Sequence, residues 1–162
     1  MKIYIFRHAQ KAHDFSINPD LTEEGHGQAL RLLDRVLQGD VPTPTQLWTS
    51  PRKRAQNTFR PLAQHLKKSL QLDEDLLEQK NDETLSAFRE RVQNVLNHAL
   101  QLPEEVIFIC SHYDWVIEAM QLVPSDTDLG ASEFSHWQPC QYVGFEVREK
   151  LFHLLESKRI PL

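Results

Sequence analysis

Short apolar runs alternate with longer amphipathic segments along the chain. Residues 3–6, 47–49 and 106–110 are rich in aliphatic and aromatic side chains and predict buried strands. Between these runs, apolar residues recur every three or four positions, which is typical of helices that bury one face. Because strands that alternate with helices usually form a parallel sheet covered on both faces, the pattern predicts a three-layer α/β/α domain with a mainly parallel sheet.

Individual residues refine the expected boundaries of the first two helices. The hydroxyl of Thr22 precedes two acids and predicts a helix start, and Gly39 predicts the end of that helix. Ser50 is expected to cap the second helix, with Pro51 at its first position. Pro61 falls inside the apolar stripe of the second helix, so we expect a kink or a break there.

The second half of the chain continues the same alternation. Its expected elements are a brief strand at 70–72, helices at 85–99 and 115–120, and strands at 142–147 and 151–155. The last two strands predict a hairpin that turns near Glu149 and Lys150. Since the chain has no internal repeat, low-complexity tract or linker, residues 1–162 are expected to form one domain.

Composition and charge narrow the functional classes. The 162 residues are 40% hydrophobic and 25% charged, which is typical of a globular chain with one core. The net charge of −5 argues against binding to nucleic acid or to an anionic membrane. Cys110 and Cys140 form no disulfide framework, the N-terminus reads as a strand rather than a signal peptide, and no apolar run has the roughly 20 residues of a membrane span. We therefore expect a cytoplasmic protein, whose oligomeric state the sequence leaves open.

Cationic and imidazole side chains follow three of the predicted strands. Arg7 and His8 come directly after the first strand, Arg54 shortly after the second, and His112 after the strand at 106–110. Because ligands of such sheets bind beyond the carboxyl ends of the strands, we expect these side chains to converge on one crevice. Guanidinium groups present paired donors that match phosphate oxygens. The pattern therefore predicts an anion site built from a few local cations.

The same positions resemble the motifs of a known family. Residues 7–9 (RHA) resemble the Arg-His-Gly signature of the histidine phosphatase superfamily, whose members have a phosphoglycerate mutase-like fold. Residues 21–29 (LTEEGHGQA) are similar to its first-helix motif, and residues 50–58 (SPRKRAQNT) to its second-arginine motif. Residues 111–112 match its second histidine. The four motifs occur in the family's order and spacing, and the resemblance extends over nearly the whole chain.

The resemblance implies a role for each of these residues. His8 would attack phosphorus and become a covalent phosphohistidine intermediate. Arg7, Arg54 and His112 would hold the transferring group. The family places its general acid after the second-arginine helix, often in a Leu-x-Glu context, which Glu78 fits best. The alternatives, in order, are Glu83, Asp82, Glu74 and Asp75. No cofactor or metal is implied, because the arginines supply the positive charge and the other six histidines lack metal-ligand spacing.

The chain departs from the family pattern at three places. Ala9 replaces the usual glycine, and residues 10–14 lack the frequent serine or threonine followed by asparagine. Tyr113 stands where a glycine usually follows the second histidine, so it could narrow the pocket or stack on a substrate as a substrate-binding residue.

Only residues 67–105 separate the second-arginine helix from the strand before His112, so no long insertion roofs the site and we expect it to be open.

Three functions remain as hypotheses. In length the chain is similar to the small bacterial phosphohistidine phosphatases, so the leading hypothesis is hydrolysis of phosphomonoesters or of protein phosphohistidine. An open site suits a phosphate carried by a small molecule as well as one carried by a phosphoprotein. The second hypothesis is a non-catalytic phosphate-binding or interaction module. The third is a phosphomutase, which the short segment above the pocket disfavours.

Overall fold

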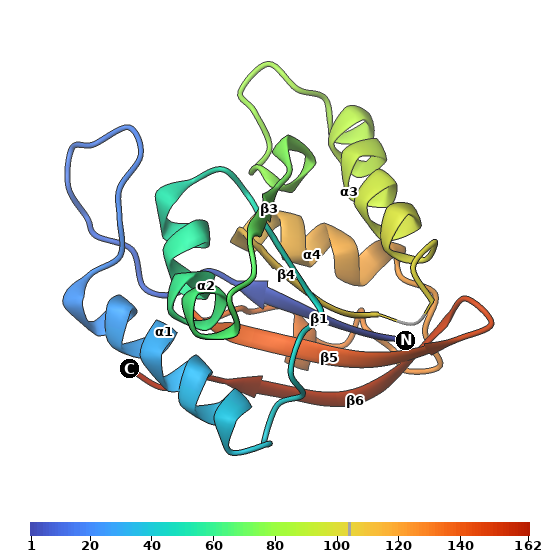
Figure 1. The fold of residues 1–162 in the computed structure, drawn as a ribbon. Helices are drawn as coiled ribbons and strands as arrows, with labels where there is room; N and C mark the ends of the chain where they lie inside the picture. The colour runs from blue at the N-terminus through green and yellow to red at the C-terminus, as the bar shows by residue number, and fades with distance from the viewer. Residues whose placement is uncertain (104) are drawn as a thin grey trace.

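The fold is a mixed six-stranded sheet with helices packed on both faces (Figure 1). A computed structural model describes residues 1–103 and 105–162. Its elements in chain order are β1 (Lys2–Arg7), α1 (Glu23–Leu37), β2 (Gln46–Thr49), α2 (Lys53–Leu66), β3 (Leu70–Leu72), the short 3₁₀ helix η1 (Glu74–Leu76), α3 (Leu85–Ala99), β4 (Val106–Ser111), α4 (Tyr113–Leu122), the 3₁₀ helix η2 (Ser132–Phe134), β5 (Gln141–Arg148) and β6 (Leu151–Arg159). The predicted α/β class with a mainly parallel sheet is confirmed.

The sheet has the strand order β3-β2-β4-β1-β5-β6. β1, β2, β3 and β4 run parallel, with β4 between β1 and β2, whereas β5 and β6 pair antiparallel at one side. The strand β4 pairs with β1 in a register that places Ser111 opposite Arg7. This order places the carboxyl ends of β1, β2 and β4 next to one another.

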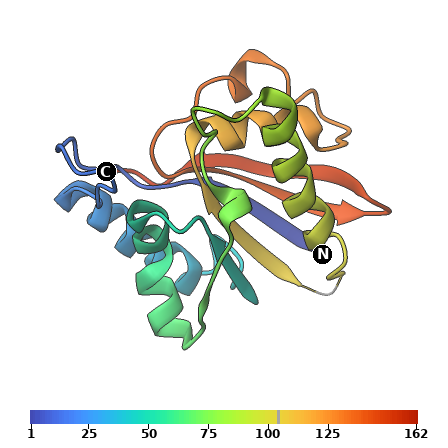
Figure 2. The same cartoon turned by 90° about the horizontal axis from the view of Figure 1, so that it is seen from above.

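Alternate side chains of the central strands enter two separate cores. In β1, Ile3 and Ile5 join the cluster that includes residues of α3 and α4, whereas Tyr4 and Phe6 join the cluster formed with α1 and α2. Figure 2 shows these helix pairs on opposite faces of the sheet. Because each fully buried aliphatic or aromatic side chain contributes roughly 1.5–3 kcal/mol, these two layers fix which way every strand residue points.

The second helix begins later than the sequence predicts. We expected Ser50 as its cap and Pro51 at its first position, but α2 begins at Lys53 and Arg52 is the capping residue. The Ser50 hydroxyl accepts from the backbone N–H of Arg52 at 3.2 Å and also lies 2.8 Å from Nε2 of His112. Ser50 therefore holds a turn and a distant imidazole, which a local capping rule does not anticipate.

Of the kink or break expected at Pro61, the break is absent, because α2 is continuous from Lys53 to Leu66. Proline removes one N–H and leaves the carbonyl four residues earlier without its helical partner. Phe59 and Leu62, on either side of Pro61, are fully buried. Their packing holds the helix together across the missing hydrogen bond.

The predicted hairpin and helix end are confirmed. Glu149 and Lys150 connect β5 to β6 with φ values of 51° and 65°, the left-handed backbone of a tight two-residue turn. Gly39 has a φ of 81° and its N–H donates to the carbonyl of Val36, which ends α1. No helix in the described residues is long and apolar enough to cross a membrane.

The start of α1 is fastened to the segment that follows His8. A Cβ placed on Gly25 would lie 2.1 Å from the carbonyl oxygen of Gln10, so only glycine allows this approach. Gln28 accepts from the N–H of Gln10 at 2.9 Å and donates to the carbonyl of Ile160 at 2.8 Å. The first-helix motif therefore positions the backbone two residues beyond His8.

Two glycines of α1 provide a matched pair of substitutions. Gly25→Ala is expected to lower the free energy of unfolding by about 1–3 kcal/mol, because the new methyl group must displace the Gln10 backbone. Gly27→Ala meets only the flexible end of Arg31, so its gain in helix propensity should raise that free energy by up to about 1 kcal/mol. Urea denaturation of both variants measures the difference. Equal effects would show that the close approach is unimportant.

Candidate active site

The parallel strands bring two histidines together. The backbone N–H of His8 donates to the carbonyl of Ser111 at 3.0 Å, and the N–H of Ser50 donates to the carbonyl of Cys110 at 3.1 Å. These bonds extend the pairing of β1, β4 and β2 one residue past their ends. As a result, the rings of His8 and His112 lie 5.3 Å apart between centroids, and each residue is 3% exposed.

A backbone carbonyl fixes the proton on His8. Its Nδ1 lies 2.7 Å from the carbonyl oxygen of Ala9, and since a carbonyl can only accept, Nδ1 must carry the hydrogen. Burial lowers the pKa of His8 well below its usual 6.5; the neighbouring His112, Arg54 and Arg7 lower this pKa further, and the hydrogen bond to Ala9 opposes them in part. At neutral pH the ring is therefore uncharged, and its Nε2 keeps a free lone pair.

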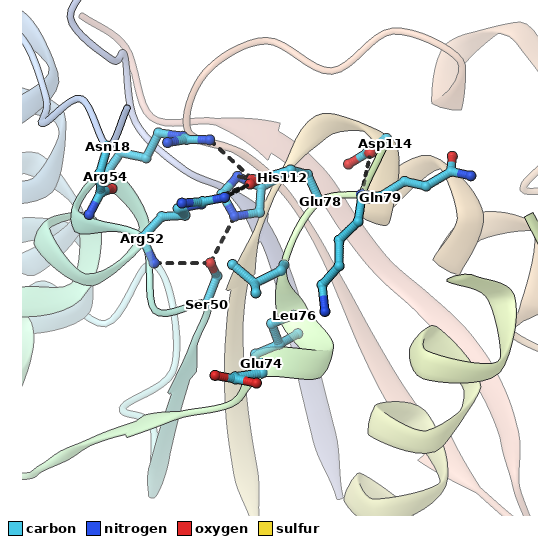
Figure 3. A network of polar contacts seen from close by, with 12 residues as sticks. Asn18, Ser50, Arg52, Arg54, Glu74, Leu76, Glu78, Gln79, His112 and Asp114 are labelled. Atoms are coloured by element: carbon cyan, nitrogen blue, oxygen red, sulfur yellow. Dashed lines mark hydrogen bonds and ion pairs between the residues drawn. The ribbon is translucent and has the colours of Figure 1, made fainter. Parts of the chain in front are cut away.

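Glu78 lies where two arginines and the second histidine meet (Figure 3). The Nε and Nη2 atoms of Arg52 approach its Oε1 at 2.7 and 2.6 Å, and Nη2 of Arg54 lies 3.1 Å from its Oε2. The Nδ1 of His112 is also 3.1 Å from Oε2, but without the alignment of a hydrogen bond. Burial lowers the pKa of His112 well below its usual 6.5, and the charges of Arg54 and Arg52 lower this pKa further. The carboxylate thus lies among cationic and neutral donors.

Arg7, the last residue of β1, lies against Tyr113 at the start of α4. One of its terminal nitrogens, Nη1, donates to the carbonyl of Trp137, and its guanidinium carbon lies 5.3 Å from the ring centroid of Tyr113. The hydroxyl of Tyr113 donates to the carbonyl of Ser135 at 3.0 Å, which fixes the ring. Within the described residues, the buried Nε atoms of Arg7 and Arg54 have no hydrogen-bond partner. Unpaired buried donors are costly, so the pocket is prepared to receive an anion.

Hydrogen bonds between distant motifs hold the site in place. The Thr58 hydroxyl donates to the carbonyl of Arg54 at 2.7 Å and accepts from the N–H of Ala9 at 2.9 Å. The Ser111 hydroxyl donates to the carbonyl of Leu76 at 2.6 Å, which fixes the segment before Glu78. The second-arginine motif and the second-histidine motif therefore orient neighbouring segments as well as supplying a side chain.

The structure brings all six sequence-predicted site residues to this crevice, and it separates the alternative acids. Glu83 forms a paired ion bridge with Arg91, at 2.6 and 2.7 Å, which lowers the pKa of Glu83 to about 2. Glu74 and Asp82 are exposed. Burial raises the pKa of Asp75, but within the described residues only Glu78 of these acids contacts Arg54 and His112.

Sequence reasoning assigned no role to Arg52 and did not anticipate the contact of Ser50 with His112. The guanidinium of Arg52, however, faces Glu78 rather than bulk solvent alone. Both residues follow β2 within three positions, where functional side chains of parallel sheets gather, but the sequence pattern indicated no specific role in the site for either of them.

A sequence comparison decides the family. Residues 3–83, half of the chain, match the histidine phosphatase superfamily, branch 1. The chain belongs to the histidine phosphatase superfamily. The matched half contains His8, Arg54 and Glu78, and the structure adds His112 from the other half. No curated protein sequence matches this superfamily member.

Solved structures share its fold along nearly the whole length. The alpha-ribazole phosphatase from Shigella flexneri has a TM-score of 0.78 at 15% identity, and covers 100% of this chain and 98% of its own. Phosphoserine phosphatase from Entamoeba histolytica has a TM-score of 0.73 at 15% identity, with 96% and 95% covered. The protein histidine phosphatase SixA, complexed with tungstate, has a TM-score of 0.72 at 16% identity, with 98% and 97% covered. At these identities the similarity establishes the fold alone.

The two buried histidines predict how stability depends on pH. Both rings have a lowered pKa in the folded chain, so near pH 6.5 and below the unfolded chain binds protons more readily. Their contribution to stability is complete above about pH 6.5 and is lost as the pH falls, by up to about 1.4 kcal/mol per pH unit for each ring. Urea denaturation between pH 7.5 and 5 should therefore show a steeper loss in the wild type than in the His8→Gln/His112→Gln variant. Parallel pH profiles would contradict this interpretation.

Proposed function

We propose that this protein is a phosphatase that hydrolyses phosphomonoesters or protein phosphohistidine through a covalent phosphohistidine intermediate on His8. The observation that carries the proposal is the state of His8: its Nδ1 is occupied by the Ala9 carbonyl, so a neutral Nε2 remains beside His112 and the arginines. Membership of the histidine phosphatase superfamily supports phosphatase activity.

In the first step, Nε2 of His8 attacks phosphorus in line with the leaving oxygen. A bond forms between nitrogen and phosphorus while the bond from phosphorus to the leaving oxygen breaks. Arg7 and Arg54 hold the equatorial oxygens, with His112 as a further donor. Because these donors are mostly buried and fixed before the reaction, they stabilise the developing charge more strongly than water would.

Glu78 is the proposed general acid and base. Its neutral carboxyl gives a proton to the leaving oxygen in the first step. The resulting carboxylate then removes a proton from water, whose oxygen attacks the phosphohistidine and releases phosphate with free His8. The contact between Glu78 and His112, 3.1 Å from oxygen to Nδ1, supports this placement beside the reacting group.

No metal or cofactor takes part in this scheme. The arginines carry the positive charge that a divalent ion supplies in other phosphoryl-transfer enzymes. Within residues 1–103 and 105–162, no group of three or more His, Cys, Asp or Glu side chains is arranged to hold a metal ion. We also propose a cytoplasmic location, which the free and buried Cys110 and Cys140 support.

Tyr113 is the proposed substrate-binding residue at the rim. Tyr113 is 39% exposed and its ring lies against Arg7, so it presents an aromatic face to the group that carries the phosphate. The non-catalytic module and the phosphomutase remain as alternatives. Phosphate binding without turnover of para-nitrophenyl phosphate would favour the module, and isomerisation of phosphoglycerate would favour the mutase.

Substitution of His8 tests the nucleophile. His8→Ala should reduce turnover of para-nitrophenyl phosphate by at least about 10³-fold, because no other group can form the intermediate. His65→Ala, which removes an exposed histidine of α2, should retain wild-type turnover. Circular dichroism verifies that both variants fold. A folded His8→Ala protein with full activity would remove the proposed mechanism.

Substitution of Glu78 tests the acid through the choice of leaving group. Glu78→Gln should slow hydrolysis of alkyl phosphates by about 10²–10⁴-fold, since an alkoxide leaves only with a proton. The effect on para-nitrophenyl phosphate should be smaller, because nitrophenolate is stable as an anion and only water activation suffers. Glu74→Gln, four residues earlier and exposed, is the control. Equal small effects of Glu78→Gln on both substrates would identify Glu78 as a surface acid.

A further inference from the structure

A cavity lies directly beside Glu78 that the proposed reaction does not use. Its volume is about 300 Å³, which is at the lower end of the range for small-molecule sites. Its lining residues are Arg52, Leu77, Glu78, Gln79, Lys80 and Asn81. Two of these side chains are cationic, Glu78 is the only acid among them, and two are neutral amides. The cavity is therefore polar and carries a positive balance, in a chain whose net charge is −5.

Glu78 forms the boundary between this cavity and the phosphate crevice. One of its oxygens, Oε2, contacts Arg54 and His112, whereas Oε1 contacts Arg52. The Arg54 side chain is 12% exposed and faces the crevice, and the Arg52 side chain is 33% exposed and lines the cavity. A leaving group that takes its proton from Glu78 would therefore extend from the crevice towards Arg52.

The charge of Glu78 changes during the proposed reaction, and this change alters the electrostatic environment of Arg52. In the structure Arg52 pairs with Glu78, but while Glu78 holds the proton that it gives to the leaving oxygen in the proposed first step, it offers Arg52 no negative charge. A guanidinium that is two-thirds covered and has lost its anion is unfavourable unless another anion replaces it. Carboxylate and phosphate groups match the paired donors of arginine, and Lys80 adds a second positive charge at the same cavity.

We propose that Arg52 and Lys80 form a subsite for a second anionic group, a carboxylate or a phosphate, on the leaving group of the substrate. This inference rests on the proposed function, because Glu78 as the acid sets the direction of the leaving group. The preferred substrates are then small phosphomonoesters that carry a second negative charge within a few bonds of the phosphate ester. The anion compensates Arg52 while Glu78 holds the proton.

Three substrates that differ in one group test the subsite. They are 2-carboxyethyl phosphate, its uncharged carboxamide, and propane-1,3-diyl bisphosphate. The wild type should prefer one or both anionic substrates over the carboxamide by about 10–100-fold in kcat/KM, the range expected for hydrogen bonds to a charged group. The anionic substrate with the larger ratio identifies carboxylate or phosphate as the ligand.

Substitutions distinguish two roles of Arg52, recognition of the second anionic group and positioning of Glu78. Arg52→Gln should reduce the preference to near unity, and Lys80→Gln should reduce it in part. If Arg52 only positioned Glu78, its substitution would slow all three substrates by the same factor and leave the ratios unchanged, which would overturn the proposal. Lys53→Gln removes the same charge from the next residue, which is exposed and outside the cavity lining, and should preserve the preference.

Binding to the His8→Ala variant separates this proposal from the proposed function. Calorimetry should show that His8→Ala binds the preferred anionic substrate about 10–100-fold more tightly than the carboxamide, without turnover. Equal binding, together with equal hydrolysis by the wild type, would overturn the subsite and leave the phosphatase intact. Selective binding by a wild type that hydrolyses none of the three would support the subsite and overturn the phosphatase.

Discussion

The site depends on the register of β1 against β4. Arg7 opposes Ser111, and the hydrogen bond from the His8 N–H to the Ser111 carbonyl continues this pairing past the end of β1. Side chains alternate between the two faces of a strand, so a slip of one residue would turn His8 away from His112. The two hydrophobic layers on either side of β1 forbid such a slip, because it would exchange Ile3 and Ile5 with Tyr4 and Phe6. Core packing therefore sets the geometry of the imidazoles.

Burial of charge is the second constraint on the site. Two neutral imidazoles are tolerated in the interior, but Arg7 and Arg54 keep their charge even though burial lowers their pKa values. In the free protein, Glu78 compensates part of this positive charge through Arg52 and Arg54. A bound phosphoryl group would compensate the positive charge of Arg54 in place of Glu78. Glu78 would then be free to exchange a proton. The same arrangement that stabilises the arginines thus prepares the pocket for an anion.

The sequence predicted those features that depend on local pattern. Apolar runs located the central strands, and the rule that ligands bind at the carboxyl ends of parallel strands pointed to His8, Arg54 and His112. Such local rules do not predict contacts between segments that are distant in the sequence. Ser50 contacts His112, 62 residues away, which a local capping rule does not anticipate. Glu83 pairs with Arg91 of α3, eight residues later, and the sequence pattern did not indicate this pair. The continuity of α2 through Pro61 likewise depends on tertiary packing.

Direct detection of the phosphorylated protein tests the central claim, that Nε2 of His8 accepts the phosphoryl group. The Glu78→Gln variant is suited to this measurement, since slow water activation should let the intermediate accumulate from para-nitrophenyl phosphate. After rapid denaturation in base, phosphorus NMR and peptide mapping should identify one acid-labile phosphate on Nε2 of His8. A phosphate on Nδ1, or on any other residue, would contradict the account, as would steady turnover with no phosphorylated protein in either the variant or the wild type.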